Sequence, residues 1–261
     1  MSLETLLLTS CAAILGAAIG SFLNVVIHRT PRSESIAYPG SRCTACGHSL
    51  SWSDNIPVLS WLALRGRCRY CKAPISARYM VVELMTAAVF ALAVLEFGAG
   101  LAGVRAALLG TFLIATMFID IDHLLILDSI TIPVAAAGLL LSIALHQALS
   151  ALEGAFLGAA LFGAVYLISR GRGLGLGDVK LAACLGIFLG LANGITAFAA
   201  SFVIGALLAL PVLALSSRGR KDVLPFGPFL VLAALIVTFS PVLVFGPYQA
   251  YQSFVSRHLG M

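Results

Sequence analysis

The sequence predicts an all-α protein that crosses a membrane several times. Of its 261 residues, 60% are hydrophobic and only 10% are charged, and the mean hydropathy is +1.03. Several apolar stretches reach the roughly 20 residues that a helix needs to cross about 30 Å of hydrocarbon. This composition excludes a soluble domain of this size. The net charge of +5 does not indicate nucleic-acid binding, because the basic residues gather in loops beside the apolar stretches.

About eight membrane-spanning helices are predicted from the lengths of the apolar stretches. They lie near residues 5–27, 80–98, 103–120, 128–147, 153–169, 179–192, 194–216 and 226–246. If the first helix runs from outside to inside, 14 of the 16 Lys and Arg residues fall on the cytoplasmic side or at its boundary. The same topology places four acids on the cytoplasmic face: Asp120, Asp122, Asp128 and Asp178.

Three parts are predicted along the chain. Residues 1–27 hold the first transmembrane helix, residues 28–79 form a polar cytoplasmic loop, and residues 80–261 form a membrane-embedded domain. The loop has eight basic residues against only Glu34 and Asp54, and it contains four of the six cysteines. Its composition differs sharply from that of the apolar stretches on both sides.

The cysteines of the loop predict a structural zinc site. Cys43 and Cys46 form one CxxC pair, Cys68 and Cys71 form another, and 21 residues separate the pairs. This spacing is typical of four-cysteine zinc ribbons. A polar loop of this length cannot bury enough apolar area to hold itself together, and zinc contributes roughly 10–16 kcal/mol in small zinc modules. Four thiolates leave no position for water, so the ion is expected to be structural. Disulfides are the alternative, which a cytoplasmic location disfavours.

A second motif, Gly175-Leu176-Gly177-Asp178-Val179-Lys180, interrupts the apolar stretches with an acid. An aspartate near the middle of a bilayer costs about 2.5–3.5 kcal/mol, so its presence indicates a function. Gly175 and Gly177 lack a Cβ and allow the backbone of a substrate to approach. Two aspartates that share one water can hydrolyse an amide, because like charges held close separate their pKa values into an acid and a base.

The partner of Asp178 is left open by helical geometry. Asp120 and Asp122 point about 200° apart on a helix, so at most one of them faces a shared site. Asp128 lies where the N-cap of the following helix is expected, which indicates a structural role.

Four sequence blocks, in this order, resemble the bacterial prepilin peptidases, which are often also N-methyltransferases. The blocks are Gly20-Ser21-Phe22-Leu23-Asn24-Val25-Val26-Ile27-His28-Arg29, the paired CxxC loop with Asn55-Ile56-Pro57 and Ser60-Trp61, Phe118-Ile119-Asp120-Ile121-Asp122-His123, and Gly175-Leu176-Gly177-Asp178-Val179-Lys180. The resemblance covers nearly the whole chain. Leu127, Thr44 and Met80 stand where the family commonly has proline, which affects local backbone shape.

The resemblance implies an inner-membrane enzyme with two activities. It would remove the leader of type IV prepilins or type II secretion pseudopilins after a glycine on the cytoplasmic side, and then methylate the new N-terminus with S-adenosylmethionine. The catalytic aspartates of the family transfer to Asp120 and Asp178. Gly175, Gly177, Asp122 and Lys180 are then supporting residues.

The methyltransferase activity depends on the resemblance alone. The loop contains no GxGxxG motif and is too short for a Rossmann domain. Gly66 and Arg67, beside Cys68, are the predicted positions for binding the cofactor.

Two other classes of protein fit parts of the pattern. A transporter could relay protons through its acids and be regulated by a zinc loop, but transport acids usually lie near the middle of the bilayer. A zinc-ribbon scaffold could bind secretion-machinery partners without catalysis, but it would have no use for the GxGD motif. Only a peptidase would shorten a prepilin peptide.

Overall fold

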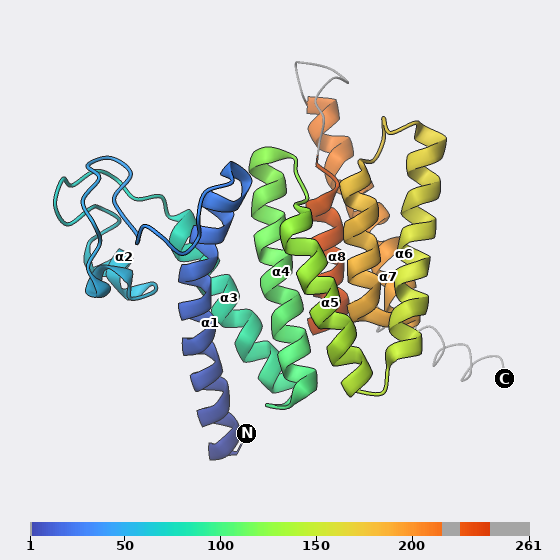
Figure 1. Ribbon diagram of the computed structural model, residues 1–261, viewed down its shortest axis with the longest axis horizontal. Coiled ribbons are helices and arrows are strands. Elements are labelled where there is room, and N and C mark those ends of the chain that lie inside the picture. The colour runs from blue at the N-terminus through green and yellow to red at the C-terminus, as the bar shows by residue number, and fades with distance from the viewer. Residues whose placement is uncertain (1, 216–224, 241–261) are drawn as a thin grey trace. The chain divides into compact units, whose positions relative to one another are not determined.

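The computed structural model describes residues 2–215 and 225–240, and the chain forms two compact units, Met1–Leu125 and Ile126–Met261. Helices make up nearly all of the regular structure in these ranges (Figure 1). Two isolated β-bridges in the loop are the exceptions in this part of the chain. The predicted all-α class is therefore confirmed.

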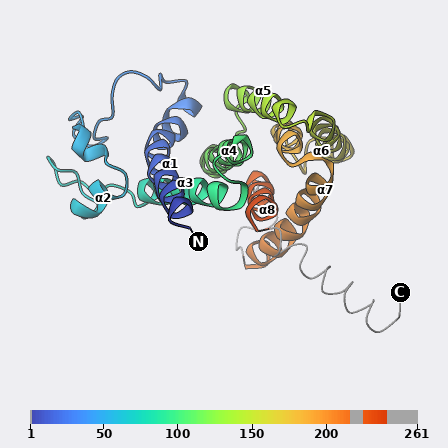
Figure 2. The ribbon, with the colours of Figure 1, turned by 90° about the horizontal axis from the view of Figure 1, so that it is seen from below.

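The first unit contains three long helices and a loop. The helices are α1 (Leu3–Arg29), α3 (Arg78–Phe97) and α4 (Leu101–His123), and the loop between α1 and α3 holds η1 (Thr30–Arg32), η2 (Trp52–Asn55) and α2 (Leu59–Ala63). Seen from below, α1 and α3 cross closely, with α4 beside α3 (Figure 2).

Small residues bring α1 and α3 into close contact. A Cβ on Gly16 would lie 2.7 Å from the carbonyl oxygen of Thr86, and one on Gly20 would lie 2.8 Å from the Cα of Glu83. Gly16 and Gly20 form a GxxxG pair, which lets two helix backbones approach in a membrane. The backbone of Glu83 in α3 therefore packs directly against α1 at Gly20.

The end of α1, the start of α3 and the end of α4 meet on the side of the loop. Asn24 near the end of α1 donates from its side-chain Nδ2 to the backbone oxygen of Tyr79, over 3.1 Å. Arg78, the first residue of α3, donates to the backbone oxygen of Phe118 near the end of α4, over 3.2 Å. These contacts connect the start of α3, where the loop ends, to the C-terminal parts of α1 and α4.

The second unit contains α5 (Asp128–Ala144), α6 (Ala148–Ser169), α7 (Leu176–Leu215) and α8 (Gly227–Phe239). Helix α7 is interrupted at Gly190, whose φ of 70° is in the left-handed region that favours glycine. The next N–H, from Leu191, donates to the hydroxyl of Ser150 over 3.3 Å. The interruption lies three residues before residue 193, where the apolar stretches 179–192 and 194–216 were expected to meet.

Helices α6 and α7 pack through glycines and phenylalanines. A Cβ on Gly186 would lie 2.0 Å from the backbone oxygen of Gly154, so the two backbones touch. Beyond this contact the ring of Phe162 lies 5.4 Å from those of Phe198 and Phe202, centre to centre. The core of this unit thus combines backbone contact at one level with aromatic packing at another.

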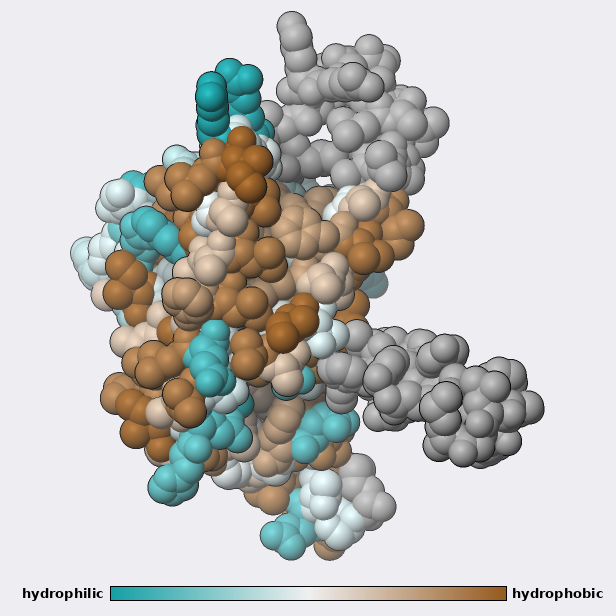
Figure 3. All heavy atoms as spheres, turned by 90° about the vertical axis from the view of Figure 1, so that its right-hand side faces the viewer, coloured by the Kyte–Doolittle hydropathy of each residue, from teal (hydrophilic) through white to brown (hydrophobic). Residues whose placement is uncertain are grey.

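In the part of the chain that the structure describes, five helices are long and apolar enough to cross a membrane, namely α1, α3, α4, α6 and α7. Helices α5 and α8 are shorter apolar helices. The face shown in Figure 3 is mainly hydrophobic, and α6 exposes Phe156, Leu167 and Ile168 to the surroundings. The chain is therefore a multi-pass membrane protein. The count of about eight spans stays a prediction. Residues 217–224 of one expected loop and 241–246 of the last expected span lie outside the described residues.

Candidate functional site

The two CxxC pairs begin hairpins with the same hydrogen-bond pattern. The N–H of Cys43 donates to the backbone oxygen of His48, and the N–H of Cys68 donates to that of Ala73, both over 2.9 Å. In each case the acceptor lies five positions after the first cysteine of the pair. The loop thus contains two copies of one local structure.

The fourth position after each first cysteine has a left-handed backbone. Gly47 has a φ of 71° and Lys72 has a φ of 60°, and each donates its N–H back to the cysteine four residues earlier. Glycine suits this conformation, whereas lysine adopts it at a cost in strain. The turn at Lys72 is therefore the strained copy.

The four thiols gather at one point. Among the described residues, Cys43, Cys46, Cys68 and Cys71 form the one group of potential metal ligands close enough to hold an ion, and all four sulfur atoms lie within 4.8 Å of one another. The sulfurs of Cys43 and Cys71 are 3.8 Å apart. A zinc tetrahedron with bonds of about 2.3 Å has edges of about 3.8 Å, whereas a disulfide bond is about 2.05 Å long. The cysteines are free, and their arrangement is compatible with zinc.

The local backbone favours a thiolate at the first cysteine. N–H groups of Cys46 and Ala45 donate to the sulfur of Cys43 and lower the pKa of its thiol to about 6. The N–H of Ala73 lowers the pKa of Cys71, but burial and the neighbouring thiols together raise it to about 11. Four thiolates this close repel one another without a cation, so the cluster suits a divalent ion.

An ion pair joins the hairpins to the rest of the loop. Asp54 in η2 accepts a hydrogen bond of 2.7 Å from Nε of Arg69, which lies between the cysteines of the second pair. This bond holds the pKa of the Asp54 carboxyl below its usual range. The ring of Tyr70 packs against that of His48 from the first hairpin, with centres 3.5 Å apart. The two hairpins therefore contact each other through side chains as well as through the thiols.

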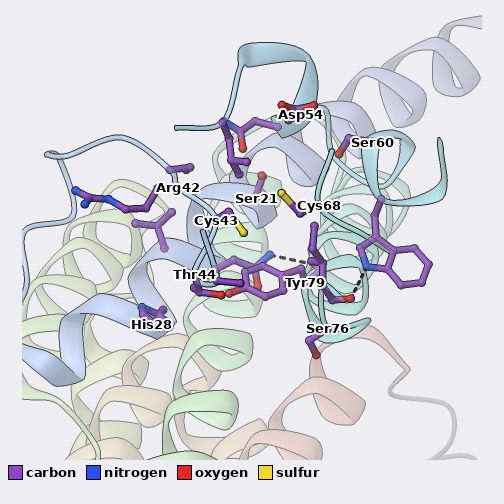
Figure 4. Close-up of a pocket in the computed structure, with 18 of the residues that line it drawn as sticks. Ser21, His28, Arg42, Cys43, Thr44, Asp54, Ser60, Cys68, Ser76 and Tyr79 are labelled. Carbon is purple, nitrogen blue, oxygen red and sulfur yellow. Dashed lines mark hydrogen bonds between the residues drawn. The ribbon is translucent and has the colours of Figure 1, made fainter. Parts of the chain in front are cut away.

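A cavity of about 1080 Å³ lies between the loop, the end of α1 and the start of α3. Ser21 and His28 come from α1, Cys43 and Cys68 from the hairpins, and Tyr79 from α3 (Figure 4). Ligand pockets commonly measure about 300–1,000 Å³, so the space is ample for a cofactor.

Neither of the two residues predicted to bind the cofactor lines this cavity. Gly66 has a φ of 65°, and a Cβ there would lie 2.7 Å from Cζ2 of Trp61. Trp61 does line the cavity, and its ring N–H donates to the backbone oxygen of Ile75 over 3.1 Å. Arg67 forms the β-bridge with Pro74 that closes the second hairpin. Gly66 therefore supports the position of Trp61.

The two aspartates near the end of α4 lie in different surroundings. Asp120 is only 5% exposed, whereas Asp122 is exposed and pairs with Arg78. The distance between Nη1 of Arg78 and Oδ2 of Asp122 is 2.5 Å, and the guanidinium carbon lies 4.6 Å from the ring centre of Phe118. The expectation that Asp120 and Asp122 face opposite ways is confirmed. Asp122 is therefore the acid that pairs with Arg78, and Asp120 is the buried acid of the two.

In the second unit, Asp178 lies in the first turn of α7. Its Oδ2 accepts a hydrogen bond of 2.9 Å from the N–H of Gly175, the residue just before α7. An acid in the first turn of a helix commonly makes this bond to the N-cap residue. A Cβ on Gly177 would lie 3.1 Å from the Cβ of Ile126, so this face of the motif is filled by the chain itself. A Cβ on Gly175 would meet only atoms of its own motif, which leaves space beside it.

Lys180 holds the start of α5 against the start of α7. Its Nζ lies 2.7 Å from Oδ2 and 2.9 Å from Oδ1 of Asp128. The expectation that Asp128 is an N-cap is wrong, because Leu127 takes that position and Asp128 is the first residue of α5. The carboxylate of Asp128 reaches across to α7 instead of capping its own helix.

Sequence reasoning missed Arg78 and Glu83 as residues of interest. Glu83 lies in an apolar helix, is 8% exposed and lines the cavity. An acid within an apolar stretch was a visible signal. Arg78 was counted only as a loop charge, because its contacts with α4 come from folding.

Comparison with known proteins gives the family. Residues 14–97 match the bacterial peptidase A24 N-terminal domain, and residues 107–210 match the type IV leader peptidase family. The chain is 37% identical to a prepilin leader peptidase/N-methyltransferase of Aeromonas hydrophila over 84% of its length and 86% of that protein. It is 44% identical to a protein of the same name from Myxococcus xanthus, over 67% of its length and 54% of that protein.

A third relative with this name, from Stutzerimonas stutzeri, is 36% identical over 87% of this chain and 88% of its own length. No solved structure matches the chain. The first two sequence blocks lie within the first family match, and the last two lie within the second. The chain belongs to the type IV leader peptidase family of bacterial membrane enzymes.

Proposed function

We propose that this chain is a leader peptidase with two activities. It cleaves the leader of type IV prepilins or type II secretion pseudopilins after a glycine, and it then methylates the new N-terminus. Three relatives that carry the name prepilin leader peptidase/N-methyltransferase support this proposal, since each aligns with two thirds or more of the chain.

Asp120 and Asp178 are the proposed catalytic pair. The observation that supports Asp120 most directly is the contrast with Asp122, which is exposed and engaged by Arg78. For Asp178, the N–H of Gly175 fixes Oδ2. Within the described residues Oδ1 has no hydrogen bond, so this atom is available to a water or a substrate. Gly175, Gly177, Asp122 and Lys180 are proposed supporting residues that shape the two helix ends.

The chemistry needs one proton shared between two carboxyl groups. One carboxylate takes a proton from the attacking water, while the other, protonated, polarises the carbonyl oxygen of the scissile amide. The protonated carboxyl then gives its proton to the leaving amine. No metal takes part in these steps, because two acids held close already differ in pKa.

The active face is proposed to lie on the cytoplasmic side of the bacterial inner membrane. The distribution of Lys and Arg favours this orientation. The apolar helix of a substrate would then stay in the bilayer while its basic leader reaches the carboxylates at the surface. In this assignment residues 1–27 anchor the chain, residues 28–79 form the zinc loop with the methyltransferase function, and residues 80–261 form the peptidase domain.

Zinc and S-adenosylmethionine are the proposed cofactors. Cys43, Cys46, Cys68 and Cys71 would hold zinc with all four positions filled, so the ion would stabilise the loop and leave hydrolysis to the aspartates. S-adenosylmethionine would supply the methyl group. The cavity beside the hairpins has room for it, and Gly66 would act by holding Trp61 at the cavity wall.

Reconstituted protein and a synthetic prepilin peptide test the proposal. We expect mass spectrometry to find a peptide cut after the glycine, and then a mass gain of one methyl group when S-adenosylmethionine is added. A crosslink between cysteines placed at positions 120 and 178 tests the catalytic pair separately. An intact peptide would contradict the proposal and would favour a transporter or a scaffold.

A further inference from the structure

The cavity of the first unit contains a buried acid that the peptidase chemistry does not use. Glu83 lies six residues into α3, is 8% exposed, and lines the cavity. Its Oε2 accepts a hydrogen bond of 2.7 Å from the N–H of Val58 in the loop. A carboxylate within a membrane helix is costly unless it has a function or a partner.

No basic side chain of the described residues forms an ion pair with this carboxylate. Three ion pairs are found within residues 2–215 and 225–240, and they join Arg69 to Asp54, Arg78 to Asp122, and Lys180 to Asp128. None of them includes Glu83. Arg29 also lines the cavity, but its guanidinium donates to the backbone oxygens of Ser35, Pro39 and Gly40. Within the described residues, the carboxylate of Glu83 has two hydrogen-bond partners, the N–H of Val58 from the loop and the side chain of Ser21 from α1.

The bond from Val58 is made under backbone strain. Val58 has a φ of 62°, a conformation that a β-branched residue adopts rarely and at a cost. Val58 directly precedes α2, which begins at Leu59. The strained backbone of Val58 therefore fixes where this helix begins. The fold thus holds Glu83 in a set position.

Trp61 offers the cavity a planar ring. Trp61 in α2 lines the cavity, its N–H is bonded to Ile75, and Gly66 packs under its ring. An indole fixed in this way is a stacking surface for an aromatic or cationic group. Arg42 also lines the space, so an anionic group of the same ligand finds a positive charge there.

We propose that this cavity binds a small organic cation and that Glu83 is its counter-charge. The inference rests on the proposed methylation, which requires two such cations. One is the sulfonium of the methyl donor, and the other is the ammonium at the new N-terminus of the cleaved peptide. A carboxylate in the cavity attracts either cation as it binds. In the transfer step the ammonium first gives a proton to solvent, and the neutral amine then forms an N–CH3 bond as the S–CH3 bond breaks. The methyl donor leaves as a neutral thioether.

Glu83→Gln separates charge from structure. Glutamine keeps an oxygen that accepts the N–H of Val58, so the contact between α3 and the loop remains while the negative charge is lost. Glu34→Gln is the matched control, because Glu34 also lines the cavity but is exposed to solvent. Zinc content of the purified full-length protein reports whether the loop stays folded in both variants.

Calorimetry with two pairs of probes tests the proposal. One pair is S-adenosylmethionine and S-adenosylhomocysteine, which differ in the charge on sulfur. The other is a cleaved pilin peptide with a free or an acetylated N-terminus. We expect Glu83→Gln to weaken binding of at least one charged probe about tenfold to hundredfold and to leave its uncharged counterpart nearly unchanged. The pair that responds identifies the cation.

Three results would overturn the inference. They are an equal loss for charged and uncharged probes, no loss for either cation, and a loss that follows Glu34 instead of Glu83. Methyl incorporation by the unaltered enzyme is measured in parallel. If the enzyme methylates but Glu83→Gln binds both cations normally, the inference fails and the proposed function stands. If the unaltered enzyme transfers no methyl group, that half of the proposed function fails by itself.

Discussion

In the first unit, the loop and the helices are stabilised in different ways. The loop is polar, and its two hairpins converge on four thiols, so a few residues hold a large part of the chain. The helices α1, α3 and α4 instead pack through many small contacts, such as those at Gly16 and Gly20. Loss of one thiol should therefore disrupt the whole loop, whereas loss of one helix contact should have a graded effect.

The comparison also separates the two proposed activities. Asp120 and Asp178 lie at the ends of membrane helices, while Glu83, Trp61 and the thiols surround the cavity of the first unit. Changes at the aspartates should stop cleavage and leave the loop intact. Changes at the thiols should affect the loop first.

The largest effect is expected for Asp120→Asn and Asp178→Asn. Each change removes a carboxyl group that must take or give a proton, so cleavage should fall by about 10²–10⁴-fold. The folded protein and its zinc content should not change. Cleavage of a prepilin peptide, followed by mass spectrometry, measures the effect.

Asp122→Asn is the control for this prediction. Asp122 lies two residues from Asp120 but is exposed and bound by Arg78, so its loss should reduce cleavage only slightly. Full activity of both Asp120→Asn and Asp178→Asn would rule out the aspartyl mechanism. A loss at Asp122 as large as that at Asp120 would mean that the wrong acid was chosen.

Cys68→Ser should have the next largest effect. Cys68 is the buried member of the four cysteines, and its thiol would be one of the four ligands of the proposed zinc. We expect the bound zinc to be lost, the loop to become sensitive to protease, and methyl transfer to disappear, while cleavage falls less. Metal analysis and limited proteolysis measure these changes.

Cys184→Ser is the matched control, because Cys184 lies apart from the cluster in α7. Its zinc content should equal that of the unaltered protein. If Cys68→Ser keeps its zinc, the four thiols do not act as one site. If it loses zinc but methylates normally, the loop does not contain the methyltransferase function.

These expectations also show how far the sequence alone could lead. The cluster of four thiols was predictable because metal ligands need fixed residue types at a fixed spacing, which is visible at Cys43, Cys46, Cys68 and Cys71. The long helices were predictable because a run of about 20 apolar residues is the length that a helix needs to cross a bilayer. The interruption at Gly190 lies three residues before the predicted boundary at residue 193.

The remaining features depend on contacts between distant parts of the chain. Nothing in the sequence near Arg78 indicates that it binds Asp122, 44 positions away. The same is true of Val58 and Glu83, which are 25 positions apart. Gly66 was predicted to bind the cofactor because it lies beside Cys68 in the sequence. In the structure it packs against the ring of Trp61 instead. Residue type predicts chemistry, but the partner of a residue is set by packing.

A moderate effect is expected for Gly186→Ala in the helix packing of the second unit. The added Cβ would lie 2.0 Å from the backbone oxygen of Gly154, so α6 and α7 must separate. Overpacking of this kind costs about 1–3 kcal/mol. The thermal midpoint of the protein in detergent should fall.

Gly163→Ala is the control, since its Cβ would lie 3.9 Å from the nearest atom, on Val179. Both changes convert a helical glycine to alanine, so their effects on helix propensity are the same. An equal midpoint for the two variants would show that α6 and α7 do not touch as described.

The smallest effect is expected for Asp54→Asn, which removes the ion pair with Arg69. The hydrogen bond from Arg69 keeps the pKa of Asp54 below its usual value of about 3.9 in the folded loop. A depressed pKa adds stability that is complete above the unfolded value and is lost only as the pH falls through the folded one. Between pH 6 and 8 the contribution is therefore constant, and it is small because Arg69 is half exposed.

The rate at which a chelator removes zinc measures this contribution, and both proteins share the same thiols. Protonation of the thiols should speed zinc loss toward pH 6 in both, so the ratio of the two rates, and not either rate, reports the ion pair. We expect Asp54→Asn to lose zinc slightly faster, by the same factor at pH 6, 7 and 8. A factor that shrinks toward pH 6 would mean that Asp54 titrates in that range and is not held by Arg69.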